Sequence, residues 1–239
     1  MDASPDIDQS KLPQHVAVIM DGNGRWAQQH GKARVYGHQH GVESVRQITE
    51  AAAEMGIPYL SLYAFSTENW NRPAYEVTAL MTLLVQTIKN EIETLQKNQI
   101  RLQAVGNLDQ LPRATHRALL RAIEQTQDNE RMTLILALNY SGKWDITQAM
   151  QSLHASGAEV TQDAIEQHLS TAQWPDPELM IRTSGELRIS NFFLWQLAYA
   201  ELYFTDIMWP DFRKDHFRQA IADFQTRQRR FGKTGEQVS

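Results

Sequence analysis

A carboxylate and an arginine flank a glycine-rich turn near the start of the chain. Residues 21–26 are Asp-Gly-Asn-Gly-Arg-Trp, and they follow the apolar run 16–20. A short apolar run that ends in Gly-x-Gly is typical of a buried strand and a tight turn, where backbone N–H groups can approach a phosphate. Asp21 would repel that phosphate unless a cation lay between them. We therefore predict that Asp21 binds Mg²⁺ and that Arg25 contacts the phosphate.

The same turn matches the dinucleotide-binding fingerprint as Gly22-x-Gly24-x-x-Ala27. That fingerprint requires an acidic residue at the end of the second strand, about 20 residues further on, to hold a ribose. At this distance the chain has Glu43, inside a predicted helix, so a nicotinamide or flavin site is disfavoured. An ordinary strand-to-helix turn would explain the glycines but not the charged and aromatic residues beside them.

The composition indicates a single domain without disulfides. The chain has 239 residues, 42% of them hydrophobic, and no linker or charged block divides it. We predict a flexible segment at 1–14, a catalytic domain at 15–232 and a tail at 233–239. The absence of cysteine excludes thiolate zinc sites and thiol catalysis, and the net charge of −5 argues against nucleic-acid binding. Residues 1–10 lack the features of a signal peptide and no apolar run could span a membrane, so we expect a cytoplasmic protein.

Apolar periodicity predicts alternating strands and helices. Apolar residues between 42 and 55 have helical spacing, and Gly56 ends that helix before a strand at 59–65. A wide apolar stripe predicts a long helix over 77–95. Short apolar strands that alternate with helices indicate an α/β fold, a single domain with a mostly parallel central sheet flanked by helices. The other predicted elements are strands at 16–20, 100–104, 134–138, 179–181 and 201–204, and helices at 113–127, from 145, at 163–169 and from 214.

Polar side chains follow the predicted strands at the points where the strands end. In a parallel sheet these ends share one edge, and ligands bind beyond it. Several of these side chains, and two more just after the first turn, are cationic or can become so, which indicates a site for a multiply charged anion. Their combination with one carboxylate fits a diphosphate with Mg²⁺ better than a carboxylate substrate. The six are Arg25, Arg34, His38, Arg72, Arg182 and Arg188.

Four sequence motifs closely resemble those of the cis-prenyltransferases, and the resemblance extends from about residue 15 to residue 232. It implies a homodimer that condenses isopentenyl diphosphate repeatedly onto farnesyl diphosphate with cis geometry. The product would be undecaprenyl diphosphate, a C55 carrier-lipid precursor for cell-wall polysaccharide synthesis, delivered to the inner face of the membrane. The Asp-Asp-x-x-Asp motif of the helical trans-prenyltransferases is absent. The four motifs are HVAVIMDGNGRWA from 15, YAFSTENWNRP from 63, IRTSGELRISNF from 181 and WQLAYAELYF from 195.

The resemblance also implies roles for individual residues. Asp21 and Asn69 would be catalytic, with Asp21 binding Mg²⁺ and Glu201 as a second acidic residue associated with the metal. A neutral amide has little basicity near pH 7, so we expect Asn69 to orient the substrate while the departing diphosphate takes the proton. The substrate-binding residues would be Gly22, Asn23, Gly24, Arg25, Trp26, Arg34 and His38 for the allylic diphosphate, Arg182, Arg188, Ile189 and Ser190 for isopentenyl diphosphate, and Ser66, Thr67, Glu68, Trp70 and Arg72 in a mobile loop between them.

Three further expectations follow from the resemblance. Leu187 stands where some members have a histidine close to the metal, so water would complete the metal's coordination. The apolar face of the long helix would line an enclosed apolar tunnel, although most of such a stripe is ordinarily core. The tunnel residues would include Leu84, Val85 and Ile88. Arg230-Phe231-Gly232 resembles an Arg-x-Gly tail that reaches a neighbouring subunit's site in part of the family, and an ordinary helix C-terminus explains it equally well.

Other classes of protein fit part of this pattern. Non-catalytic partner subunits of the same fold lose the strand-end aspartate and the basic cluster, both of which this chain retains. A Mg²⁺-dependent phosphohydrolase would also suit Asp21 and the arginines, but the sequence supplies no evident nucleophile. Glu201 could instead form a structural ion pair at a strand end.

Overall fold

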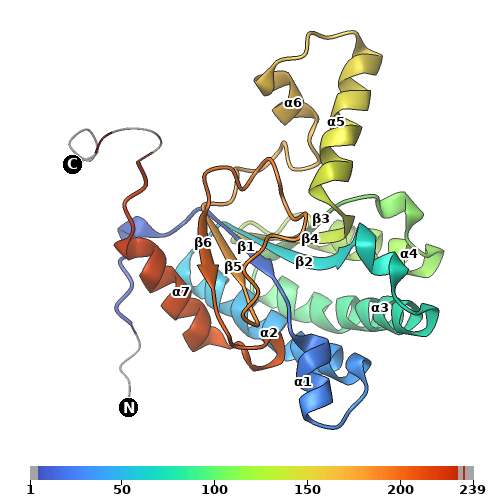
Figure 1. The fold of residues 1–239 in the computed structure, drawn as a ribbon, viewed down its shortest axis with the longest axis vertical. Coiled ribbons are helices and arrows are strands. Elements are labelled where there is room, and N and C mark those ends of the chain that lie inside the picture. Colours follow the sequence, from blue (N-terminus) through green and yellow to red (C-terminus); the bar gives the residue numbers. More distant parts are fainter. Residues whose placement is uncertain (1–4, 231–233, 235–239) are drawn as a thin grey trace.

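A parallel β-sheet forms the centre of the molecule (Figure 1). The structure is a computed structural model that describes residues 5–230 and 234, and within them the sheet has six strands in the order β3-β4-β2-β1-β5-β6. Every neighbouring pair is parallel, so the predicted α/β fold is confirmed. The strands are β1 (His15–Ile19), β2 (Tyr59–Ser66), β3 (Ile100–Val105), β4 (Met132–Tyr140), β5 (Leu179–Arg182) and β6 (Glu201–Phe204).

Both faces of the sheet are buried. Alternate strand residues point to opposite faces, so Val16 and Val18 pack under α2, α3, α4 and α7, whereas Ala17 and Ile19 pack against the segment around Phe192. Burial on both sides explains why the strands are almost continuously apolar. Figure 1 shows α5 and α6 projecting from the body. The helices are α1 (Asn23–Gln29), α2 (Arg34–Met55), α3 (Ala74–Lys97), α4 (Arg113–Thr126), α5 (Gly142–Ser156), α6 (Gln162–His168) and α7 (Lys214–Thr226).

The second helix begins earlier than the apolar pattern predicts. Its first turns carry few apolar residues but include Arg34 and His38, which the helix holds near the glycine-rich turn. It ends as predicted at Gly56, which has φ 85°. Of the predicted Arg-x-Gly tail, Phe231 and Gly232 lie outside the described residues.

Candidate active site

The carboxyl ends of β1 and β5 are joined next to Asp21. The register pairs Ile19 with Arg182, so Asp21 lies just beyond the end of β1 and beside Thr183. The Thr183 hydroxyl accepts a hydrogen bond from the backbone N–H of Asp21 (2.9 Å) and donates one to its carbonyl oxygen (2.7 Å). The chain then turns at Gly22, which has φ 104°, and a Cβ there would lie 2.9 Å from the Cβ atom of Ser184. Both the backbone conformation and the close approach require glycine at this position.

Asp21 carries a charged carboxylate at this junction. Its Oδ1 atom accepts from the backbone N–H of Gly22 (2.6 Å), and Oδ2 accepts from Nη2 of Arg182 (2.8 Å). Nη2 of Arg25 lies farther away, 3.6 Å from Oδ2. Partial burial raises the pKa of Asp21, but the hydrogen bonds from Arg182 and Gly22 and the charges of the two arginines outweigh it, so the pKa lies below its usual value. The side chain is 32% exposed, so a ligand can reach it.

Arg182 connects Asp21 to the loop that follows β5. Its side chain is 4% exposed, and its guanidinium donates to Asp21, to Oγ of Ser190 (2.7 Å) and to the backbone carbonyl of Arg188. Ser190 has φ 48°, a left-handed conformation that costs energy for a residue with a side chain. The structure thus brings together Asp21, Arg182 and Ser190, which the sequence predicts to share a site.

Glu186 joins two of the predicted phosphate-binding arginines. Its carboxylate lies 3.2 Å from Nη1 of Arg25 and also accepts from Nη1 of Arg188. Arg25 donates in addition to Oγ of Ser184. Two guanidinium groups that share one carboxylate retain a net positive charge that favours an anion. Glu186 was not among the predicted site residues, although an acidic residue within the basic motif 181–192 was an available signal.

A second basic pair forms around Glu76, in the first turn of α3. The Glu76 side chain is 3% exposed, and its carboxylate lies 3.1 Å from Nη1 of Arg72 and 3.4 Å from Nε of Arg34. Arg34 also packs closely on the glycine-rich turn, because a Cβ on Gly24 would lie 2.5 Å from Cζ of Arg34. A larger residue at position 24 would therefore displace the Arg34 guanidinium. Glu76 was also missed, and its only sequence signal was its spacing of four residues from Arg72.

His38, one of the predicted potential phosphate donors, is neutral near pH 7 in this structure. Burial lowers its pKa to about 4, the charges of Arg72 and Arg34 lower it too, and the charge of Glu76 opposes them. Its Nε2 atom is buried and has no hydrogen-bond partner. A neutral imidazole can still donate one hydrogen bond, so contact of His38 with a substrate stays a prediction.

The predicted substrate loop is a 3₁₀ helix (Thr67–Asn71) that caps itself. The side-chain oxygen of Asn69 accepts from the backbone N–H of Ser66 (3.2 Å), and Oγ1 of Thr67 donates to Glu68 (3.2 Å). Asn69 therefore holds the loop together, and a role in proton transfer remains untested.

Two other side chains fasten this loop to its neighbours. Oε1 of Glu68 accepts from Nδ2 of Asn191 (2.8 Å), and Nε1 of Trp70 donates to Oδ1 of Asn139 (2.8 Å). Burial raises the pKa of Glu68, but its hydrogen bonds, that from Asn191 first, lower it below the usual value. The loop is thus connected to the segment that contains Ser190.

Three other predicted binding residues have structural contacts. Trp26 is 8% exposed and donates through Nε1 to Asp211 (2.8 Å). Ile189 packs against the core around Phe192 and Phe193. Asn23 is also buried, and its Nδ2 atom donates to the Met20 carbonyl (3.2 Å), but its Oδ1 atom has no hydrogen-bond partner. This unused acceptor lies against α2, because a Cβ on Gly41 would be 2.5 Å from it.

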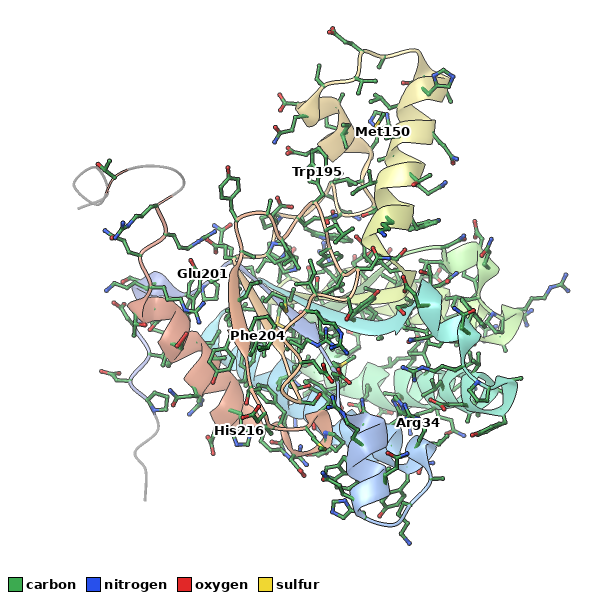
Figure 2. All side chains as sticks on the ribbon, in the orientation of Figure 1. Arg34, Met150, Trp195, Glu201, Phe204 and His216 are labelled. Carbon is green, nitrogen blue, oxygen red and sulfur yellow. The ribbon has the colours of Figure 1, made fainter. Side chains whose placement is uncertain are left out.

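Glu201 lies away from Asp21. It is the first residue of β6 and pairs with Leu179 at the start of β5, three strand positions or about 10 Å before the edge where Asp21 lies. Figure 2 shows it far from Arg34. Its carboxylate accepts from Nη1 of Arg227 (3.0 Å). Glu201 therefore forms the strand-end ion pair that was the alternative, while its association with a metal stays a prediction.

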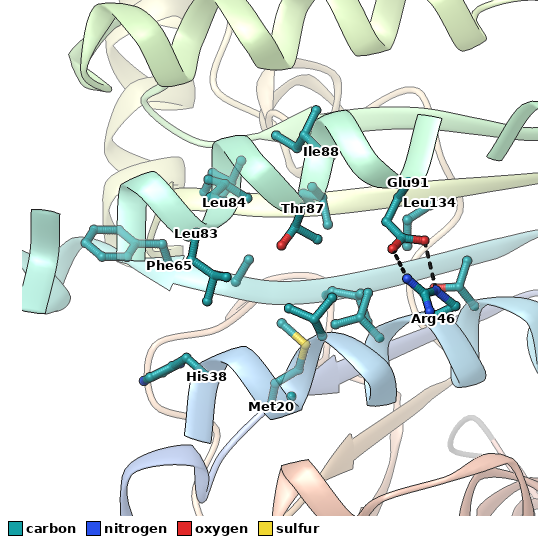
Figure 3. A pocket seen from close by; sticks show the side chains of 18 of the residues that line it. Met20, His38, Arg46, Phe65, Leu83, Leu84, Thr87, Ile88, Glu91 and Leu134 are labelled. Atoms are coloured by element: carbon teal, nitrogen blue, oxygen red, sulfur yellow. Dashed lines mark hydrogen bonds and ion pairs between the residues drawn. The ribbon is translucent and has the colours of Figure 1, made fainter. Parts of the chain in front are cut away.

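An apolar cavity of about 190 Å³ lies between α2, α3 and the sheet (Figure 3). Asn23 and His38 line it together with side chains that are mostly leucine, isoleucine, valine and methionine. Of the predicted tunnel residues, Leu84 and Ile88 line this cavity and Val85 does not, while an enclosed tunnel stays a prediction. An apolar cavity with a few polar groups is typical of a site for an apolar ligand.

The described residues offer few metal ligands. They contain no group of three or more His, Cys, Asp and Glu side chains that could hold a metal ion. Asp21 is the carboxylate that the basic residues surround, and each of its oxygens keeps a lone-pair direction beyond the hydrogen bond described above. None of the described helices is long and apolar enough to cross a bilayer.

Known proteins share both the sequence and the fold. The prenyltransferase family model for undecaprenyl diphosphate synthase matches residues 19–232. A ditrans,polycis-undecaprenyl-diphosphate synthase ((2E,6E)-farnesyl-diphosphate specific) of Haemophilus ducreyi is 48% identical over 97% of this chain and 99% of its own length. An isoprenyl transferase of Chlorobaculum tepidum is 48% identical over 95% of this chain and 88% of its own length. The crystal structure of lavandulyl diphosphate synthase from Lavandula x intermedia, in complex with dimethylallyl diphosphate, has a TM-score of 0.90 and 36% identity, covering 94% of this chain and 100% of that one.

Proposed function

Because this chain belongs to the undecaprenyl diphosphate synthase family of prenyltransferases, we propose that it condenses isopentenyl diphosphate repeatedly onto farnesyl diphosphate. Each addition has cis geometry, and the product is undecaprenyl diphosphate. The non-catalytic subunit and the phosphohydrolase are the competing classes. Family membership favours a transferase over both of them.

The observation that carries this proposal is the position of a basic cluster beside an apolar cavity. Asn23 belongs to the glycine-rich turn that contacts Arg34, and the same residue lines the cavity. His38 lies one helical turn after Arg34 and lines it too. A prenyl diphosphate has the same two parts, an anionic head and a hydrocarbon chain. With its head on Arg25 and Arg34, its chain would enter the cavity.

A second diphosphate would bind on the other side of Asp21. Arg182 donates to both Asp21 and Ser190, and Arg188 lies in the same loop with Glu186. Arg182 would therefore contact both the isopentenyl diphosphate and the carboxylate of Asp21, which faces the allylic substrate. These two contacts would hold the reacting carbon atoms of the two substrates close together. Such positioning is a large part of the catalysis of a two-substrate reaction.

The residues present fit a magnesium ion at Asp21. Mg²⁺ prefers oxygen ligands, and it is often held by one carboxylate together with phosphate oxygens and water. Asp21 would supply the carboxylate, and the surrounding arginines would hold the phosphate. Mg²⁺ would offset the negative charge that develops on the leaving diphosphate. The apolar side chain of Leu187 has no donor atom, so water would complete the coordination.

The residues of the chain would then act on the substrates as follows. The allylic carbon–oxygen bond breaks and the diphosphate leaves with the electron pair, stabilised by Arg25 and Arg34. A new carbon–carbon bond forms to the isopentenyl group, which loses a proton. The departing diphosphate is a better acceptor of this proton than the Asn69 amide. Asn69 would contribute by fixing the conformation of the loop after β2, through its hydrogen bond with the backbone N–H of Ser66.

The remaining features of the proposal are not visible in one chain. The enzyme works as a homodimer, makes a carrier-lipid precursor for cell-wall polysaccharide, and acts in the cytoplasm at the inner face of the membrane. It does not bind nucleic acid, in keeping with its net charge of −5.

The test is to incubate the purified chain with farnesyl diphosphate, radiolabelled isopentenyl diphosphate and Mg²⁺, and to separate the products by reversed-phase chromatography. The proposal requires a C55 product and release of inorganic diphosphate. Release of inorganic phosphate without elongation would instead establish the phosphohydrolase. Elongation that requires a second, different chain would establish the partner subunit.

A further inference from the structure

Two ion pairs connect α2 with α3 at separate points along the helices. The proximal ion pair joins Arg34 to Glu76 beside the polar site. The distal ion pair joins Arg46 to Glu91 through two hydrogen bonds, from Nε to Oε2 at 3.2 Å and from Nη2 to Oε1 at 2.5 Å. Such two-pronged contacts fix both side chains more firmly than a single hydrogen bond does.

The apolar cavity begins near the proximal ion pair, at His38, and continues past the distal one to Thr49 and Leu95. The pairs are separated by about 18 Å along α2 and about 22 Å along α3, given the rise of an α-helix. Leu84 and Ile88 line the cavity between them, and Arg46 and Glu91 themselves also line it. Figure 3 shows the distal ion pair crossing from α2 to α3 at one end of the row of apolar side chains. A hydrocarbon chain that grows away from the polar site must therefore meet two charged groups.

The distal ion pair is only partly in contact with water. The Glu91 side chain is 14% exposed and that of Arg46 is 42% exposed. A hydrocarbon chain packed against the pair would remove more water from both charges, and the loss of hydration of a charged group is strongly unfavourable. A hydrocarbon chain that grows up to the pair gains apolar contacts. A chain that grows past the pair gains such contacts only at the cost of removing water from the two charged groups.

We propose that the Arg46–Glu91 ion pair sets the length of the hydrocarbon chain that the cavity accepts. This inference rests on the proposed prenyltransferase function and adds a specificity-determining pair to it. Neither side chain contacts the residues around Asp21, so the pair acts on chain length and not on bond formation.

The test compares product lengths between the wild-type enzyme and Glu91→Gln. Glutamine keeps the size of the side chain but removes one charge and weakens the bond to Arg46, so the share of products longer than the main wild-type product should rise several-fold. The rate of the first addition, when the chain is still short, should stay close to that of the wild type, whereas additions beyond the main wild-type length should become faster. The charge-exchanged variant Arg46→Glu/Glu91→Arg restores an ion pair and should restore the wild-type length distribution.

Glu43→Gln is the matched control. Glu43 accepts from Nη1 of the same Arg46 at 3.3 Å but does not line the cavity, so this variant should keep the wild-type product lengths. Thermal unfolding establishes that each variant is folded. Unchanged or shorter products from folded Glu91→Gln would overturn the inference, as would an equal change in Glu43→Gln. If the wild-type chain does not elongate farnesyl diphosphate at all, the proposed prenyltransferase function is wrong. That outcome is distinct from a failure of the role given to the Arg46–Glu91 pair.

Discussion

Nη2 of Arg182 donates to Oδ2 of Asp21 at 2.8 Å from a side chain that is 4% exposed. The carboxylate of Asp21 therefore contacts the buried guanidinium on one side, and a ligand can bind on its exposed side. A substitution at Asp21 can affect the contact with Arg182, the binding of the ligand, or both, and two different substitutions distinguish these effects.

Asp21→Ala should reduce the rate of condensation by about a thousandfold or more, because the leaving diphosphate loses its bound cation. Asp21→Asn should be nearly as inactive, although its amide oxygen can still accept from Arg182. Single-turnover kinetics at saturating Mg²⁺ measures the loss, and circular dichroism checks the fold. Turnover of either variant close to that of the wild type would exclude Asp21 as the metal ligand.

Glu76→Gln should weaken the positions of Arg34 and Arg72 together. Each arginine loses a charge-assisted hydrogen bond, so kcat/KM for farnesyl diphosphate should fall by about 10- to 100-fold. Glu93→Gln, an exposed carboxylate on the same helix, is the control. Steady-state kinetics that show equal effects of the two substitutions would contradict the role of Glu76.

Leu84→Trp should shorten the products before it unfolds the protein, because Leu84 is partly buried and lines the cavity. Val85→Trp is the matched control, since Val85 is the next residue on the same helix and does not line the cavity. Chromatography of products from both variants makes the comparison. Product lengths that are unchanged in a folded Leu84→Trp variant would remove this helix from the path of the chain.

His38→Gln should make stability less dependent on pH. The pKa of His38 is lowered to about 4 in the folded chain from an ordinary value of 6.5, so the unfolded chain binds more protons between these values. The stability conferred by the neutral side chain is therefore present above pH 6.5 and is lost as the pH falls toward 4. Between pH 7 and pH 5 the wild type should lose about 2 kcal/mol more than the variant. Urea unfolding across this range tests it, and parallel curves would contradict the pKa.

A mixing experiment tests whether the Arg230-x-Gly232 tail acts across a homodimer. If it does, a chain with Asp21→Ala still supplies an intact tail to a partner with Arg230→Ala, and re-associated mixtures should regain about a quarter of full activity. The experiment requires that Arg230→Ala alone be nearly inactive and that subunits exchange. A mixture no more active than its separate components would then show that the tail does not act across the dimer.

The fold was predictable because most of its signals are local. The near-continuous apolar runs of β1 and β4 identify buried parallel strands, and Gly56 marks the end of α2. The polar residues after β1 and β5 also meet as predicted, since parallel strands end at one edge. The start of α2 could not be predicted from apolar spacing, because its first turns face the polar site and not the core.

Properties that depend on tertiary contacts could not be predicted. His38 can be cationic by residue type, but burial lowers its pKa, and burial is not visible in sequence. Glu201 belongs to the motif WQLAYAELYF, but the register that puts it at the start of β6 and beside Arg227 is not visible there either. Glu76 and Glu186 were missed because a carboxylate that holds two arginines in position has no sequence pattern of its own. Its role depends on which arginines lie beside it in the folded chain.

The cavity between α2 and α3 has a thermodynamic consequence for turnover. A hydrocarbon chain that packs into this apolar cavity is removed from water, and its binding stabilises the folded chain. The enzyme should therefore be most resistant to heat when its longest product is bound. The same gain opposes dissociation. Release of the finished chain, and not bond formation, should therefore limit steady-state turnover, and detergents or lipids that accept the chain should accelerate it.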